Sequence, residues 1–229
     1  MLYILRSFIF KLIAEVQQLD SKEKTITYII FYILSFTILR ILFRHFRIKQ
    51  SGKRGERKVK RILKKYKKDV FVMNDVMLPL YDNYTQIDHL VIGDFGLIVI
   101  ETKNHSGIIY GDKNAKKWVI KKNLFNKKDF YNPVKQNETH KKTVNYWLKH
   151  NHFNVPIDNL VVFTGNVTVK CKGRVPICSP KQLKRYINSY IKNPKTTVEK
   201  EAIYNYLKQI NVTSKSAKKQ HLKFVKSFH

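Results

Sequence analysis

The residues best suited to chemistry are two carboxylates and a lysine in the most apolar stretch after residue 43. Asp88 and Glu101 lie on either side of a glycine-containing turn, and Lys103 follows Glu101 by two positions. Like charges directly opposed in a sheet repel, so an Asp–Glu pair there needs a compensating cation. A divalent metal ion together with Lys103 would supply one. Such a set is typical of a site that cuts phosphodiester bonds.

The element that must position these residues is a predicted β-hairpin. Two short apolar runs flank the sequence Gly-Asp-Phe-Gly at 93–96, a pattern that favours a hairpin turn. A symmetric turn with the two glycines paired places Asp88 opposite Glu101, and Gln86 opposite Lys103. Side chains alternate along a strand, so we expect all four groups on one face, with Gln86 at the periphery of the site.

A fourth candidate lies on a basic helix predicted over residues 53–66. Its apolar stripe includes Val59 and Leu63, and Glu56 stands at helical spacing from both. A carboxylate that faces inward from a helix of Lys and Arg is a candidate site residue. The alternative is an acid that the helix dipole favours near the N-terminus.

The remaining pattern predicts a sheet with helices on both sides, because both faces of the hairpin are apolar. A helix begins at Asn132-Pro133 and places Gln136 and His140 one turn apart. We expect His89 to point away from the carboxylates, and His105 and His140 to be near them in sequence only. Further strands are predicted at 70–72, 76–80, 108–110, 117–120, 160–163 and 175–178, and further helices at 180–191 and 198–210, before a basic tail.

A membrane helix is predicted at residues 25–43, which carry a single charge, Arg40. As a helix this stretch is about 28 Å long, close to the hydrocarbon thickness of a bilayer. Lys and Arg are more frequent after it than before it, which favours a single-pass protein of the cell membrane with its bulk in the cytoplasm. A buried helix of a soluble protein is the alternative. Residues 1–24 are expected to be amphipathic, with residues 2–19 lying on the membrane or forming a second span.

The charge balance points to a polyanion. The formal net charge is +29, from 45 Lys and Arg against 16 Asp and Glu. Nucleic acid and an anionic membrane surface both suit such an excess. An AT-rich genome, which favours lysine codons, is the alternative explanation. Cys171 and Cys178 match neither a familiar zinc spacing nor a disulfide framework.

Four motifs in order, with flanking matches, make the chain resemble the nuclease-related domain (NERD) family of the PD-(D/E)xK nuclease superfamily. The resemblance covers about residues 52–150. The matching residues are Gly55-Glu56 at a helix start, Gln86-Ile87-Asp88-His89, Phe95-Gly96, Ile100-Glu101-Thr102-Lys103, Gly107, Gly111, Trp118 and Asn132-Pro133-Val134-Lys135-Gln136.

The resemblance implies an α/β domain at 50–192, restriction-endonuclease-like, with a mixed central sheet flanked by helices and preceded by the transmembrane helix. It implies metal-dependent phosphodiester hydrolysis, with Asp88 and Glu101 as metal ligands. Lys103 would be the catalytic lysine, Glu56 the acid of the first core helix and Gln136 the family's later glutamine. Mg²⁺ is the expected ion, with Mn²⁺ as an alternative. Residues 193–229 would form a helix and a basic C-terminal tail.

Three functions compete. The first is a membrane-anchored nuclease that acts on DNA at the cytoplasmic face. The second is a non-catalytic module that tethers nucleic acid to the membrane, and the third is a protein whose basic surface contacts only anionic lipid. Binding alone requires Lys and Arg and leaves Asp88 and Glu101 without a purpose, which favours the nuclease.

Overall fold

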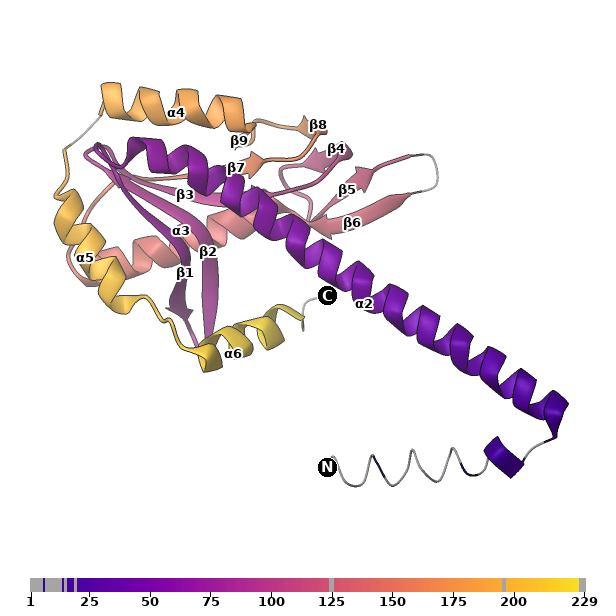
Figure 1. Ribbon diagram of the computed structural model, residues 1–229. Coiled ribbons are helices and arrows are strands. Elements are labelled where there is room, and N and C mark those ends of the chain that lie inside the picture. Colours follow the sequence, from indigo (N-terminus) through magenta and orange to yellow (C-terminus); the bar gives the residue numbers. More distant parts are fainter. Residues whose placement is uncertain are drawn as a thin grey trace. The chain divides into compact units, whose positions relative to one another are not determined.

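The computed structural model describes residues 6, 14, 16–18, 20–123, 126–194 and 197–226 (Figure 1). The amphipathic segment expected at residues 2–19 therefore lies mostly outside the described residues. The chain divides into two compact units, Met1–Gln50 and Ser51–His229.

The first unit consists mainly of the start of one long helix, α2 (Ser21–Leu63). Asp20 caps it, because its Oδ1 accepts a hydrogen bond of 2.7 Å from the Glu23 N–H. Its apolar stretch has a mean hydropathy of 2.1 and is fully exposed, so the helix is long and apolar enough to cross a membrane. Soluble core helices and signal sequences pass the same test of length and composition.

The helix expected at 53–66 is not a separate element. Residues 53–63 continue α2, and a short 3₁₀ helix, η1 (Lys64–Tyr66), follows. The intervening residues 44–52 contain no proline and several good helix formers, so nothing there ends the helix.

The second unit is built on a five-stranded mixed sheet in the order β1-β2-β3-β7-β9. The bounds are β1 Phe71–Leu80, β2 Asn83–Gly93, β3 Gly96–Lys103, β7 Ile157–Phe163 and β9 Ile177–Cys178. The first three strands are antiparallel neighbours, whereas β7 runs parallel to both β3 and β9. Short turns join the antiparallel strands, and the parallel return to β7 passes through helix α3 (Pro133–His150).

Helices cover both faces of this sheet, as predicted. One face packs its apolar side chains against the end of α2 and against α4 (Pro180–Lys192), with Val59, Val91 and Leu183 in one buried cluster. The other face packs against α3 and α5 (Lys200–Ile210), with Leu90, Val144 and Ile203 in a second cluster. Central strands buried on both sides explain the nearly continuous apolar run of β3.

A second sheet was not expected. Its strands are β4 (Gly107–Asp112), β5 (Lys117–Lys121), β6 (Lys127–Tyr131) and β8 (Val167–Lys172), in the order β6-β5-β4-β8. Sequence predicted β4 and β5 but missed β6 and β8, and it made the strand ending at Cys178 two residues too long. The fold is therefore mixed α/β with two mixed sheets rather than one central sheet. A last helix, α6 (Lys215–Lys226), occupies the expected basic tail.

One strand pair departs from simple alternation. Met73 and Val76 of β1 share a buried cluster although they are three residues apart, and so do Ile87 and Leu90 of β2. The cause is Asp75, whose positive φ of 56° interrupts the pleat between Met73 and Val76. Strict alternation along the hairpin predicts Ile87 on the opposite face from Leu90. That prediction is wrong, because both strands change face at this point.

Candidate active site

The hairpin register is the predicted one. Gly93 pairs with Gly96, and the ladder between β2 and β3 continues to His89 opposite Ile100. The next positions are Asp88 and Glu101, where Asp88 turns its side chain to the neighbouring strand. Its Oδ2 accepts a hydrogen bond of 2.7 Å from the Thr102 N–H. Asp88 is thus fixed to the end of β3 through its carboxylate rather than through the backbone ladder.

Glu101 is the buried centre of the site, with 3% of its surface exposed. Its Oε1 lies 2.7 Å from Lys103 Nζ, and its Oε2 lies 3.3 Å from His140 Nε2. Glu101 Oε2 and His140 Nε2 are close but lack hydrogen-bond geometry, and neither atom has a hydrogen-bond partner among the described residues. His140 also contacts Thr85, with 2.7 Å between its Nδ1 and the threonine hydroxyl. One carboxylate oxygen of Glu101 thus faces Lys103 of β3, and the other faces His140 of α3.

Helix α3 carries Gln136 and His140 to this place. Asn132 caps it by accepting hydrogen bonds from the next N–H groups, and Pro133 occupies the first turn. The buried Asn137 amide donates to the carbonyls of Val99 and Leu160, at 3.0 and 3.1 Å. This links α3 to β3 and β7, so the helix has a fixed rotation over the sheet.

Gln136 lies against the lysine. Its Oε1 accepts a hydrogen bond of 3.0 Å from Lys103 Nζ, so the ammonium is held between Gln136 and Glu101. The Lys103 side chain is 22% exposed, which leaves it accessible from one side.

Glu56 approaches the site because Gly55 lets α2 come close to the strands. A Cβ at Gly55 would lie 2.7 Å from Thr164 Oγ1 and 2.9 Å from Asn104 Cβ. These are closer than ordinary contacts, so only glycine fits. Glu56 is partly buried. Its pKa is raised above the ordinary value mainly by burial, and further by the negative charges of Asp75 and Glu101.

The charged groups of the site change one another's pKa. The pKa of Asp88 is raised well above its usual range, mainly by burial and further by the neighbouring Glu101 carboxylate. Burial alone would raise the pKa of Glu101 too, but Lys103 and His140 outweigh it and lower that pKa to about 2. Burial would lower the pKa of Lys103, but Glu101 beside it reverses the shift and raises that pKa.

Five of the six predicted residues come together: Asp88 and Glu101 with Lys103, Gln136 and Glu56. Gln86 does not follow the prediction. The β2–β3 ladder stops before it, and its amide instead donates to Asp75 Oδ1 at 2.6 Å.

Of the histidines, His89 is buried and bonded to Asn74 Oδ1 at 2.7 Å, as expected for a packed residue. His140 was expected to be near the carboxylates in sequence only, but it contacts Glu101. No local sequence pattern predicts this contact. The spacing of His140, one helical turn from Gln136, was the available signal.

The donor set suits one kind of ion. Within the described ranges, no group of three or more His, Cys, Asp and Glu side chains gathers closely enough to hold a metal. Two carboxylates remain, Asp88 and Glu101. Mg²⁺ is held in many phosphate-handling sites by one or two carboxylates, with water and substrate phosphate completing its shell. The residues therefore fit Mg²⁺ bound together with a phosphate substrate, and they do not fit a fully enclosed structural ion.

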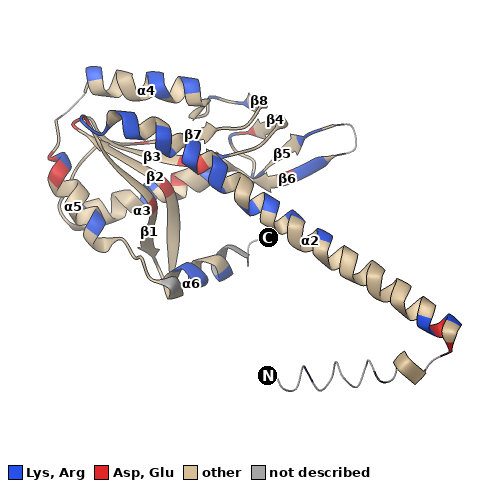
Figure 2. Cartoon of the chain, viewed as in Figure 1, with Lys and Arg blue, Asp and Glu red and all other residues tan. Residues whose placement is uncertain are grey.

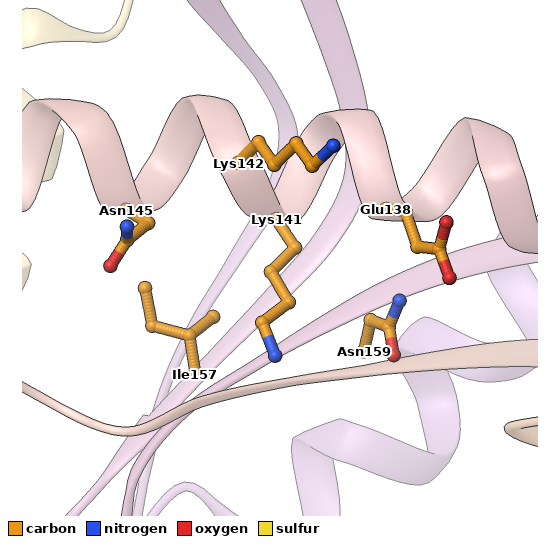
Figure 3. A pocket seen from close by; sticks show the side chains of 6 residues that line it. All are labelled: Glu138, Lys141, Lys142, Asn145, Ile157 and Asn159. Atoms are coloured by element: carbon orange, nitrogen blue, oxygen red, sulfur yellow. The ribbon is translucent and has the colours of Figure 1, made fainter.

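A hollow of the described part of the chain lies elsewhere. It has a volume of about 440 Å³ and lies between α3 and β7, where Lys141 extends from the helix toward the strand (Figure 3). None of the six predicted residues lines it. The candidate site is identified by its charged groups and not by an enclosed cavity.

Comparison with known proteins places the chain in a family. The family model described as nuclease-related domain, NERD, matches residues 51–164, which include all six predicted site residues. An uncharacterized protein of Bacillus anthracis is 33% identical over 187 residues, covering 77% of this chain and 84% of that protein. No solved structure matches. These findings show that the chain belongs to the nuclease-related domain family.

Proposed function

We propose that this protein is a membrane-anchored, metal-dependent nuclease that hydrolyses phosphodiester bonds of DNA at the cytoplasmic face. Family membership supports a nuclease-related function. The choice of DNA, Mg²⁺ and membrane attachment is our own inference from the residues.

The observation that carries the proposal is a surplus of negative charge around Glu101. Asp88, Glu101 and Glu56 interact electrostatically, Lys103 contacts Glu101, and Lys53 acts on Glu56. A pair of enclosed carboxylates costs free energy unless a cation compensates them. The raised pKa of Asp88, caused by burial and Glu101, is the mark of that missing compensation. Such conflicts are typical of functional sites, and a divalent ion would resolve this one.

Each residue then has a role. A bound Mg²⁺ would polarise the phosphoryl oxygen and acidify a coordinated water. Asp88 and Glu101 would hold that ion. Lys103, steered by Gln136 and Glu101, would orient the attacking water or stabilise the charge that develops on the phosphate. Glu56, with its raised pKa, can hold or release a proton at its carboxylate close to Lys103.

The arrangement of elements supports the same reading. In chain order, a helix and three antiparallel strands are followed by β4, β5 and β6 of the second sheet, and then by a helix and a parallel strand of the first sheet. The acids lie at one end of the first sheet. This order is consistent with the restriction-endonuclease-like core that the family resemblance implies. The excess of Lys and Arg suits a polyanionic substrate. The exposed apolar stretch of α2, followed by a basic segment, supports anchoring with the second unit in the cytoplasm.

The test is cleavage of a plasmid by the full chain in nonionic detergent, with Mg²⁺, Mn²⁺ or EDTA. We expect nicked or linear DNA with either ion and none with EDTA. Glu101→Gln should abolish cleavage, whereas Glu138→Gln, which removes an exposed acid of α3, should leave it unchanged. Tight DNA binding without cleavage under any ion would instead favour the tethering module.

A further inference from the structure

A second polar hollow lies close to the candidate active site. It has a volume of about 350 Å³. The residues that line it are Ser106, Gly107, Ile108, Lys122, Asn166 and Thr168. No Asp or Glu is among them, so the Lys122 ammonium carries its only formal charge. A hollow of this composition attracts an anion.

The polar side chains that line this hollow are available to bind a ligand. Within the described ranges, Ser106, Lys122, Asn166 and Thr168 make no side-chain hydrogen bond or ion pair with the protein. Two hydroxyls, one amide and one ammonium can all donate to the same acceptor. Phosphate oxygens accept from these groups in nucleic-acid complexes, where they position the strand without reading its sequence.

Backbone hydrogen bonds connect the segment from Lys103 to Gly107 with the segment from Thr164 to Asn166, and the second of these bonds lies at the hollow. The Lys103 carbonyl accepts from the Thr164 N–H at 2.9 Å, and the Asn166 carbonyl accepts from the Gly107 N–H at 3.0 Å. Gly107 follows Lys103 by four positions, a span of at most about 14 Å. At about 3.4 Å of rise per nucleotide, this corresponds to no more than about four nucleotide steps.

The β5–β6 hairpin, whose turn begins with Lys122, carries further positive charge, visible as blue segments in Figure 2. Lys121 and Lys127 are directly opposed in the ladder, an arrangement in which like charges repel. No acid in the described part of the chain pairs with either lysine. A bound polyanion would relieve this repulsion.

We propose that this hollow, with Lys122 as its cation, binds a backbone phosphate of the nucleic-acid strand close to the bond being cut. The inference rests on the proposed function and extends it. The Ser106 and Thr168 hydroxyls and the Asn166 amide donate to the phosphate oxygens, and the β5–β6 hairpin attracts the neighbouring phosphates. The ligand is the nucleic-acid backbone and not a lipid headgroup, because the hollow lies beside the loop that follows Lys103.

The first experiment measures binding without cleavage. The full chain in nonionic detergent is titrated with DNA in EDTA between 50 and 200 mM salt. Lys122→Ala should lower the slope of log affinity against log salt by about 0.9, the value of one phosphate contact. Over this fourfold range the wild type should lose about 3.5-fold more affinity than the variant. Thr168→Val should weaken binding without changing the slope, because it removes a neutral donor.

Lys117→Ala is the matched control, since Lys117 is an exposed lysine of β5 that does not line the hollow. It should change the slope much less than Lys122→Ala. Equal slopes for the two variants would overturn the proposal, because the lysines would then act only as diffuse charge. A loss of binding to phosphatidylglycerol vesicles with Lys122→Ala, at unchanged DNA affinity, would overturn it in favour of a lipid surface.

The second experiment locates the phosphate. A single neutral methylphosphonate linkage in the DNA should depress wild-type cleavage at a bond up to about four nucleotides away. Lys122→Ala should lose this remote effect and keep the effect of a neutral linkage at the cut bond itself. A remote effect unchanged by Lys122→Ala would contradict the assignment. Because the binding experiment needs no cleavage, it still decides the inference if the proposed nuclease activity fails.

Discussion

The contact between α2 and the strand ends is most sharply tested by Gly55→Ala, with Gly52→Ala in the same helix as control. A Cβ at Gly55 would lie 2.7 Å from Thr164 Oγ1, whereas one at Gly52 would meet nothing closer than 4.0 Å. Ordinary contacts begin at 3.4 Å, so α2 must move away by about 0.7 Å, the difference between 3.4 and 2.7 Å. Both variants gain the same helix propensity, up to about 1 kcal/mol, which cancels when they are compared.

The difference between the two variants is therefore the cost of overpacking, about 1–3 kcal/mol. At about 2–4 °C per kcal/mol, the melting temperature of Gly55→Ala should lie about 2–12 °C below that of Gly52→Ala. Glu56 moves with the helix, and a displacement of this size should lower plasmid cleavage about ten- to hundredfold. Thermal unfolding and cleavage of both full-length variants, in the same detergent, measure these effects. Equal stability and equal activity would refute the role of Gly55.

Three further expectations concern the site and its supports, and a fourth concerns the membrane. Asn137→Ala removes two buried hydrogen bonds to strand carbonyls and should lower the free energy of unfolding by about 2–4 kcal/mol in chemical denaturation. Gln136→Ala should slow single-turnover cleavage about tenfold without weakening DNA binding, because Lys103 keeps its charge and loses one support. The pKa of His105 is lowered to about 4, mainly by burial and further by the charges of nearby lysines. Its unfolded value is near 6.5, so between these two values the unfolded chain binds more protons, and the free energy of unfolding falls as the pH is lowered. His105→Gln should reduce this loss in melts from pH 7 to 4. If residues 25–43 span the bilayer as proposed, protease added outside intact cells should leave the second unit uncut.

Local features of the fold were predictable from sequence because they depend on neighbouring residues. The Gly93–Gly96 turn fixed the hairpin register, and the Asn132-Pro133 pair marked the start of α3. Glycine turns and helix caps satisfy backbone groups within a few residues, so they leave a clear pattern.

Non-local features were missed. The pairing of β4 with β8 is parallel and joins segments far apart in the chain, so no nearby turn sequence indicates it. The change of face at Asp75 depends on one left-handed residue that is not glycine. This is also why Gln86 turns to Asp75 rather than toward Lys103. The contact of His140 with Glu101 requires the rotation of α3 that Asn137 fixes, which is a property of packing.

The most direct test of the central claim is Asp88→Asn, with binding and cleavage measured on the same DNA. The substitution removes a metal ligand and one negative charge, while the amide oxygen can still accept from the Thr102 N–H. DNA binding in EDTA should be equal or stronger, because repulsion of phosphate is reduced. Single-turnover cleavage with Mg²⁺ should fall by orders of magnitude. Cleavage at the wild-type rate would contradict the metal site and with it the proposed nuclease mechanism.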